Sequence, residues 1–210
     1  MYTPSAFVVD DLPTLHGWIE RYSFATLFSA ASDALEASHL PLLLDREEGA
    51  MGTLVGHFAR ANEQHRRGSG ERVLAIFHGP HAYVSPRWYE SANLVPTWNY
   101  IAVHAYGRLE IVDDPAATLE LVRRMTAHYE ASFDEPWQLA APEDALLSLA
   151  KQIVAFRIRI ERLEGKAKLS QNHPRHRRES VIAGLGQSAV EQDRDVAAAM
   201  RATLAAGSGP

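Results

Sequence analysis

The chain has 210 residues, of which 46% are hydrophobic and 22% charged, so it can bury one sizeable core but is short for two ordinary domains. The absence of cysteine excludes disulfides, thiolate metal sites and cysteine nucleophiles, and it suits the cytoplasm. No window approaches the roughly 18 apolar residues that a membrane span needs, and no signal-peptide pattern opens the chain. We therefore expect a cytoplasmic protein without a membrane segment.

The formal charge of −5 argues against a surface built throughout to bind nucleic acid, because such binding needs clustered Lys and Arg. The charge is unevenly spread, however. Residues 157–178 hold eight Lys or Arg against two Glu, a local charge of +6, so this stretch can hold an anion.

The first half of the chain predicts a short helix followed by an antiparallel meander. Asp10 and Asp11 precede apolar residues at helical spacing over 12–22, which favours a capped helix. Short apolar runs separated by polar residues then favour strands, and we read His78-Gly79-Pro80-His81 as a turn between two of them. The expected strands are 24–30, 34–44, 51–58, 72–77 and 82–85.

The second half predicts two long strands and four helices. Apolar and polar residues alternate over 103–111, the pattern of a strand with one buried face. Asp114-Pro115 and Pro142 open two helices, and two more follow Pro174, joined at residues 184–186. Residues 156–163 also alternate, but the pattern shifts at its end, so we expect a bulge or the end of that strand near Arg162.

These elements predict an α+β fold, mainly an antiparallel Greek-key barrel with peripheral and C-terminal helices. Periodicity alone does not distinguish this barrel from a sandwich. We divide the chain into a barrel domain over 1–173, a helical extension over 174–205 and a disordered tail over 206–210.

Two segments carry side chains suited to a phosphate. In the first, a strand ends at His57 and runs into Arg60 and Asn62, where a guanidinium and turn amides could meet phosphate oxygens. In the second, Lys166 and Lys168 project to one side of an extended chain. Ser170, Gln171 and Asn172 follow and add hydrogen-bonding groups. The alternatives are a helix start and a hairpin end that merely face solvent.

Aromatic residues gather between these segments. Trp98 and Tyr100 share one face of an expected strand, and Tyr83, Trp88 and Tyr89 lie in the preceding hairpin region. Such rings could line a planar heterocycle, but a core or a dimer interface uses the same residues. The ten histidines form no recognisable metal-ligand spacing, and no Gly-x-Ser-x-Gly motif of a serine hydrolase occurs. We therefore expect no metal site.

Four motifs stand in order along the chain. They are Gly56-His57-x-Ala59-Arg60-Ala61-Asn62, Gly79-Pro80-His81-Ala82-Tyr83-Val84-Ser85-Pro86-x-Trp88-Tyr89, Pro96-Thr97-Trp98-Asn99-Tyr100 and Glu164-Gly165-Lys166-x-Lys168-Leu169-Ser170-Gln171-Asn172. Together they resemble the PaiB family of FMN-binding negative transcriptional regulators, and the resemblance extends from the N-terminus to about residue 185.

The resemblance implies an FMN-binding split β-barrel, similar in fold to pyridoxamine-phosphate oxidases and flavin reductases, with flavin sites shared across a homodimer. By analogy, the His57–Asn62 turn and the two lysines would hold the phosphate, and the Trp98–Tyr100 strand would line the isoalloxazine ring. The expected cofactor-binding residues are His57, Arg60, Asn62, Tyr83, Ser85, Thr97, Trp98, Asn99, Tyr100, Lys166, Lys168, Ser170, Gln171 and Asn172.

The chain departs from the family pattern at two places. Glu63, Gln64 and His65 stand where a proline and an aromatic are usual, and His173 stands where an arginine is usual. Losing one charge-assisted contact weakens binding by about ten- to a hundredfold, so FMN could be held more weakly here.

Three functions remain open at this point. A negative regulator could contact DNA, but the last helix opens with Glu191, Asp193 and Asp195, which repel phosphate, so direct DNA binding is not favoured. An FMN-dependent oxidoreductase of the flavin-reductase or pyridoxamine-phosphate-oxidase kind would use the same site. A dimeric module that binds another phosphorylated ligand is the third reading.

Overall fold

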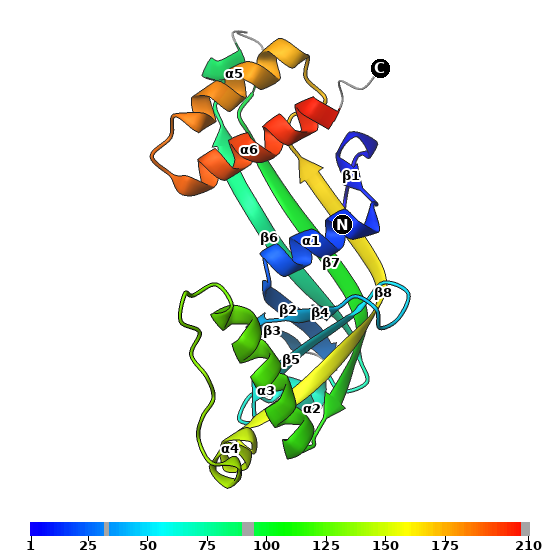
Figure 1. Cartoon of the computed structure of the whole chain (residues 1–210). Coiled ribbons are helices and arrows are strands. Elements are labelled where there is room, and N and C mark those ends of the chain that lie inside the picture. Colours follow the sequence, from blue (N-terminus) through cyan, green and yellow to red (C-terminus); the bar gives the residue numbers. More distant parts are fainter. Residues whose placement is uncertain (32–33, 90–94, 207–210) are drawn as a thin grey trace. The chain divides into compact units, whose positions relative to one another are not determined.

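The structure is a computed structural model that describes residues 1–31, 34–89 and 95–206 (Figure 1). The sequence predicts a disordered tail over 206–210, and residues 207–210 of that tail lie outside the described residues. The helices are α1 (Leu12–Arg21), α2 (Gln64–Arg67), α3 (Pro115–Glu130), α4 (Glu143–Ala150), α5 (Arg175–Gly186) and α6 (Glu191–Ala206), with 3₁₀ helices η1 (Ser5–Phe7) and η2 (Pro86–Tyr89). The strands are β1 (Val8–Val9), β2 (Phe24–Ala31), β3 (Ala34–Pro41), β4 (Leu43–Asp45), β5 (Thr53–Ala59), β6 (Arg72–Val84), β7 (Thr97–Val112) and β8 (Ile153–Lys168).

The strands form one sheet in the order β3-β2-β6-β7-β8-β5-β4, with β1 paired to β8. The pairs with a described register are antiparallel. Gly56 of β5 lies opposite Phe156 of β8, for example, and Val8 of β1 lies opposite Lys166 of β8. Each long strand therefore brings residues far apart in the sequence side by side.

The chain divides into two compact units, and neither is a continuous segment. The first unit comprises Met1–Leu15, His78–Val103 and the chain from Glu164 on; the second comprises His16–Phe77 and His104–Leu163. Strands β6, β7 and β8 each contribute residues to both units.

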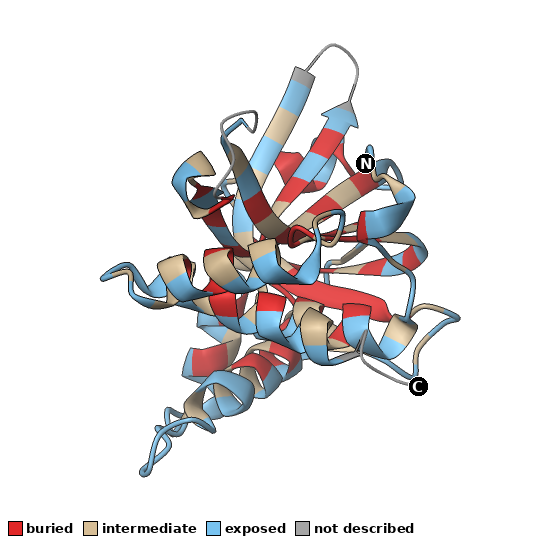
Figure 2. Ribbon diagram, turned by 90° about the horizontal axis from the view of Figure 1, so that it is seen from above, coloured by how far each residue is buried: buried red, intermediate tan, exposed pale blue. Residues whose placement is uncertain are grey.

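The second unit is built on the β2–β3 hairpin, β4, β5 and the adjoining parts of the long strands. Its fully buried side chains include Phe58, Phe77 and Phe156, and the rings of Phe58 and Phe156 lie 4.6 Å apart. Helix α3 packs Leu121 and Met125 against the sheet. Figure 2 shows buried residues along the strands and on one side of the helices, as expected for amphipathic elements.

Helix α3 begins where the sequence predicts it. The Asp114 side chain accepts a hydrogen bond of 3.0 Å from the Ala116 backbone N–H, and Pro115 follows at the first helical position. The Asp114 side chain thus satisfies one free donor of the helix N-terminus, and Pro115 has no backbone N–H that would need a partner. Helix α4 likewise begins directly after Pro142, so both predicted helix starts are confirmed.

The first unit combines the last part of β6, the first part of β7 and the end of β8 with α5 and α6, which lie across these strands in Figure 1. Helix α5 packs on α6 and on η2. A Cβ on Gly184 would lie 2.4 Å from the Trp88 ring, so the missing side chain lets η2 approach α5 closely. The predicted helical extension over 174–205 corresponds to α5 and α6.

The strand predicted over 103–111 is confirmed as part of β7. Val103, Ala105 and Leu109 are buried, whereas Arg108 and Glu110 between them are exposed. None of the described helices is both long and apolar enough to cross a membrane.

The structure corrects one prediction about the long strands and decides between the two alternatives of another. The expected turn at residues 78–81 is wrong, because β6 runs through it without a break. Gly79 and Pro80 are both buried, so the alternation of buried and exposed residues shifts by one position there. Such a shift is typical of a β-bulge, which tolerates a proline. Strand β8 continues past Arg162 to Lys168, so it does not end there, but its alternation breaks at Glu161 and Arg162, which agrees with the alternative of a bulge.

Candidate functional site

A cavity of about 220 Å³ in the first unit brings predicted site residues from two strands and the turn after β8 together; we call it the Lys168 pocket. Among the expected cofactor-binding residues, Thr97, Asn99, Lys168, Ser170 and Asn172 line it. The other lining residues are Phe7, Tyr89, Val95 and His173; of these, Tyr89 belongs to one of the family motifs and His173 is a departure from the family pattern.

Lys168 stands at the end of β8 and turns its ammonium group toward β7. The Nζ atom donates to Thr97 Oγ1, and it also donates to the Trp98 carbonyl at 2.6 Å. Burial and then the charge of Lys166 lower the pKa of Lys168 below its ordinary value. Both partners are neutral, and no described carboxylate forms an ion pair with this lysine. An anion in the pocket would supply the missing negative charge.

Lys166 precedes it on β8 by two residues and is only 6% exposed. Its Nζ donates to the Tyr2 carbonyl at 3.0 Å and lies 5.1 Å from the centre of the Tyr100 ring. No described carboxylate pairs with it either. Two ammonium groups are thus held close to each other with only neutral partners, an arrangement that a nearby anion stabilises.

The turn after β8 is held in an unusual conformation. Ser170 has a φ of +64° and is buried, and Asn99 Nδ2 donates to its hydroxyl at 2.9 Å. Gln171 closes the same turn, because its side chain accepts from the Leu169 N–H and donates to the Ala167 carbonyl. A left-handed non-glycine residue is uncommon and is often found at functional sites.

His173 and Arg177 add further basic groups beside the pocket. The His173 ring stacks on Tyr89 with the ring centres 4.9 Å apart. Burial, then Arg177, then Lys168 lower the pKa of His173. The Nε of Arg177 is buried and has no hydrogen-bond partner among the residues that the structure describes.

The Tyr89 hydroxyl is the other polar group at this end of the pocket. It is buried and has no hydrogen bond of normal geometry within the described chain. Burial raises the pKa of Tyr89, and the nearby Ser170 hydroxyl offsets part of that rise. Buried polar atoms without partners are uncommon, so this hydroxyl is available to a ligand in the Lys168 pocket.

The predicted aromatic residues do not all share one role. Strand alternation directs Trp98 away from the face of Thr97 and Asn99. The exposed rings of Trp98 and Tyr83 meet edge to face at 6.0 Å, and His81 lies 6.2 Å from Trp98. Ser85, also on the predicted list, accepts hydrogen bonds from Arg87 at the start of η2, and Tyr100 lies beside Lys166.

The remaining predicted residues, His57, Arg60 and Asn62, belong to the second unit. The Arg60 guanidinium donates to the Lys151 and Ile153 carbonyls and forms an ion pair with Asp113 at 2.8 Å. If Arg60 also bound a phosphate, its guanidinium would make that contact in addition to these three.

Asn62 organises the turn that follows β5. Its side chain donates to the Ser38 hydroxyl at 2.8 Å and accepts from the Gln64 N–H at 3.0 Å. The buried Gln64 amide then donates to the Leu27 carbonyl and the Ser29 hydroxyl. The contacts of Asn62 thus hold α2 against β2 and β3, and its predicted role toward a phosphate stays a prediction.

His57 leads to a prediction about stability. Its Nδ1 is buried without a partner in the described chain, and burial lowers the pKa of His57. The unfolded chain therefore binds the proton more readily, so this histidine destabilises the fold as pH falls below its ordinary pKa of about 6.5. We expect His57→Gln to lose less stability than the parent between about pH 7.5 and 5.5, measured by chemical denaturation. An equal loss in both proteins would contradict this prediction.

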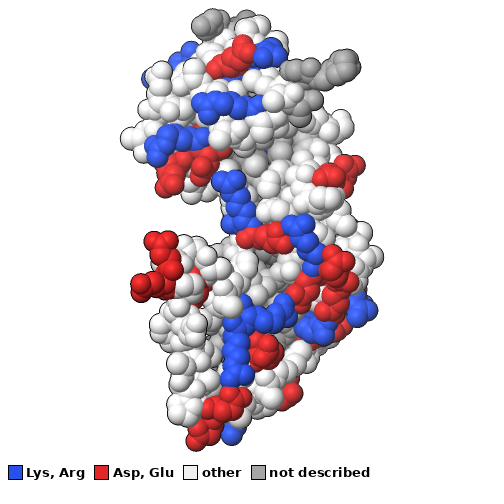
Figure 3. All heavy atoms as spheres, in the orientation of Figure 1, with Lys and Arg blue, Asp and Glu red and all other residues white. Residues whose placement is uncertain are grey.

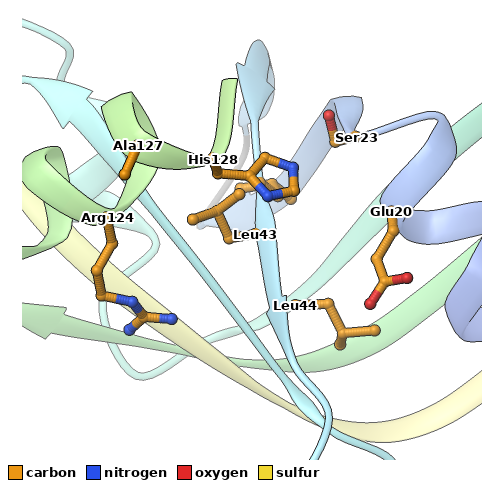
Figure 4. Close-up of a pocket in the computed structure, with 8 residues that line it drawn as sticks. Glu20, Ser23, Leu43, Leu44, Arg124, Ala127 and His128 are labelled. Atoms are coloured by element: carbon orange, nitrogen blue, oxygen red, sulfur yellow. The ribbon is translucent and has the colours of Figure 1, made fainter. Parts of the chain in front are cut away.

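A second cavity, of about 490 Å³, lies in the second unit and is shown in Figure 4. Leu43 and Leu44 lie between Glu20 on one side and Arg124 on the other. Both charged side chains already have partners, since Glu20 binds Arg46 and Arg124 forms an ion pair with Asp45. None of the predicted site residues lines this cavity, and its paired charges make it less suited to an anion than the Lys168 pocket.

Comparisons with known proteins identify the family. Residues 1–162 match the family described as "Putative FMN-binding domain". The chain is 38% identical over 175 residues to "Protease synthase and sporulation protein PAI 2" of Bacillus subtilis, covering 82% of this chain and 83% of that protein. An uncharacterized protein of Aspergillus fumigatus is 29% identical over 248 residues, covering 94% and 95% of the two chains.

Solved structures share the fold. The flavocytochrome Anf3 of Azotobacter vinelandii is similar with a TM-score of 0.61 at 16% identity, covering 76% of this chain and 68% of that one. The FAD and heme binding protein of Mycobacterium smegmatis also gives 0.61, at 14% identity, covering 84% and 80%. The predicted α+β fold, an antiparallel split β-barrel with peripheral helices, is confirmed. The chain belongs to the FMN-binding domain family and is a homologue of the PaiB protein of Bacillus subtilis.

Proposed function

We propose that this protein is a cytoplasmic FMN-binding homodimer that acts in negative transcriptional regulation. The observation that carries the flavin part of the proposal is the group of basic side chains around the Lys168 pocket, none of which has a described carboxylate partner. The regulatory part rests on the likeness to PAI 2, whose name links that protein to protease synthesis and sporulation.

The residues of the pocket fit the polar end of FMN. An ammonium group, two amides and hydroxyl groups converge on a cavity that no acidic side chain lines. Its volume of about 220 Å³ is below the roughly 300–1,000 Å³ of pockets that hold a whole drug-sized ligand. The pocket thus suits a phosphate and part of the ribityl chain, and the flavin ring would lie outside it.

The chain's own residues would hold the cofactor in two ways. Lys168, Ser170 and Asn172 would bind the phosphate, with Lys166 adding charge. The exposed Trp98 and Tyr83, 53% and 46% accessible, do not line the pocket, and Trp98 lies on the other face of β7, so they would offer aromatic surface to an isoalloxazine ring across the proposed homodimer. When bound, FMN supplies one- and two-electron redox chemistry.

The homodimer is supported by the same exposed aromatic surface. Trp98, Tyr83 and the exposed Val95 belong to the first unit, and interfaces are enriched in aromatic side chains. The mass in solution, measured by light scattering with and without FMN, tests this part. A monomer under both conditions would contradict it.

Direct DNA binding is not favoured as the route of regulation. On the face in Figure 3, acidic side chains lie among the basic ones. Helix α6 opens with Glu191 and Asp193, and Arg175 on α5 is paired with Glu179. We therefore propose that any DNA contact is indirect or made by a partner.

An FMN-dependent oxidoreductase is the second candidate. The ring centres of His81 and Trp98 lie 6.2 Å apart, so an imidazole would lie near a flavin ring placed against that indole. FMN-dependent oxidation of NADH or NADPH by the purified protein would favour this candidate. Sequence-selective retention of promoter DNA would favour the regulator.

The absorption spectrum of the freshly purified protein tests the flavin proposal most directly. Protein that carries flavin shows the visible bands of oxidised FMN, or gains them when FMN is added and unbound cofactor is removed. A colourless protein that retains no added FMN would contradict the proposal. It would favour the module that binds another phosphorylated ligand.

A further inference from the structure

His173 occupies a position in which the charge of a ligand in the Lys168 pocket would affect the protonation of its imidazole. It lines the cavity directly, its backbone N–H donates to the Ser170 carbonyl at 3.0 Å, and its ring is stacked on that of Tyr89 in η2 with the ring centres 4.9 Å apart. The stacking fixes the plane of the imidazole, and the ring is only partly exposed. A protonated imidazole there would be a charge-assisted donor to any anion bound beside Lys168.

The groups that face His173 come from three elements. Tyr89 contributes a neutral ring from η2, Lys168 a cation from β8 and Arg177 a cation from α5. No acidic side chain lines the pocket. The two cations therefore oppose protonation of the imidazole while the pocket holds no anion, and a bound dianion reverses that balance.

We infer that His173 is a specificity-determining residue of the Lys168 pocket, which takes up a proton from solvent when a phosphate monoester dianion binds. The inference rests on the proposed function and goes beyond it, because it states that the affinity of the pocket depends on both the phosphate group of the ligand and the pH. FMN carries this phosphate and riboflavin does not.

The direction of the effect follows from linkage. Because the bound dianion favours the protonated imidazole, affinity rises as pH falls through the range where His173 gains its proton. The phosphate itself takes a second proton near pH 6, which weakens binding below that pH. The two titrations together predict the tightest FMN binding slightly above pH 6 and weaker binding toward pH 8.5.

The test measures the Kd of FMN and of riboflavin by quenching of flavin fluorescence at about pH 6.5 and 8.5, at constant ionic strength. In the parent protein we expect FMN to bind up to about tenfold more tightly at the lower pH, and riboflavin affinity to stay constant. His173→Gln should lose the pH dependence of FMN binding. His173→Arg should bind FMN tightly at both values, because its charge is fixed.

A matched control is available three residues further on. His176 is exposed on α5 and does not line the pocket, so His176→Gln should keep the parent's pH dependence. Circular dichroism of each variant at both pH values shows that the fold is retained.

Each outcome separates the inference from the proposed function. FMN that binds more tightly than riboflavin, but with the same pH dependence in His173→Gln as in the parent, overturns the inference and leaves the proposed function standing. Equal affinity for FMN and riboflavin also overturns the inference, since the phosphate group would then contribute nothing to binding. Failure of the parent to bind either flavin overturns the proposed function itself.

Discussion

Replacing both Lys166 and Lys168 by alanine is expected to weaken FMN binding by more than about a hundredfold. Each charge-assisted contact to phosphate contributes about 1.5–3 kcal/mol, which is roughly ten- to a hundredfold in Kd. Neither lysine has a described carboxylate partner, so no internal ion pair compensates when FMN is absent. Fluorescence titration of FMN against the purified variant gives the Kd.

Two controls separate a lost phosphate contact from a damaged fold. Lys168→Arg keeps the charge and should lose much less affinity. Lys151→Ala removes an exposed lysine of the second unit and should leave the Kd unchanged. Lys166 also donates to the Tyr2 carbonyl, so the melting temperature of the double variant must be checked. FMN affinity equal to that of the parent would show that the phosphate is not held by these lysines.

Alanine at Gly107 is expected to destabilise the fold by about 3 kcal/mol. A Cβ there would lie 2.3 Å from the Arg159 carbonyl oxygen and 2.7 Å from Ile158 Cγ2. The closest atom is backbone of the adjacent strand β8, so only a shift of the two strands could relieve the clash. For a chain of this length the melting temperature should fall by roughly 6 to 12 °C.

Gly17 in α1 is the matched control for the glycine prediction. A Cβ there would meet no atom within 4 Å, and helix interiors favour alanine over glycine. Gly17→Ala should therefore raise the free energy of unfolding by about 0.5–1 kcal/mol. Similar melting temperatures for the two variants would mean that the close approach of β7 and β8 does not restrain the fold.

Local patterns were enough to predict most elements of the fold. The alternation over 103–111 identified β7 because one face of that strand is buried, and Asp114-Pro115 marked the start of α3 because capping depends on neighbouring residues alone. The error at Gly79-Pro80 has the same origin. A glycine–proline pair is a local turn signal, but the neighbouring strands of the sheet keep β6 extended through it.

The candidate site was only partly accessible from the sequence. Thr97, Lys168 and Ser170 could be selected because they lie within motifs that resemble one family. Tyr89 also lies within such a motif, but its contact with His173 could not be predicted, and neither could the burial of Arg177, because both depend on packing between η2, the turn after β8 and α5. Contacts between elements distant in sequence leave no periodic pattern along the chain. His173 had one signal, its departure from the usual arginine, but its ring contact and cationic neighbours emerge only in three dimensions.

The interleaved composition of the two units has a consequence for how the protein is made. The second unit needs residues up to Leu163, and the first needs β8, α5 and α6, which follow or overlap that point. Domains commonly fold one after another during synthesis. Here most of the nascent chain must leave the ribosome before either unit contains all the strands that it needs to fold. Polypeptides truncated before Leu163 should thus emerge with unburied apolar strands and be prime targets for chaperones and proteases.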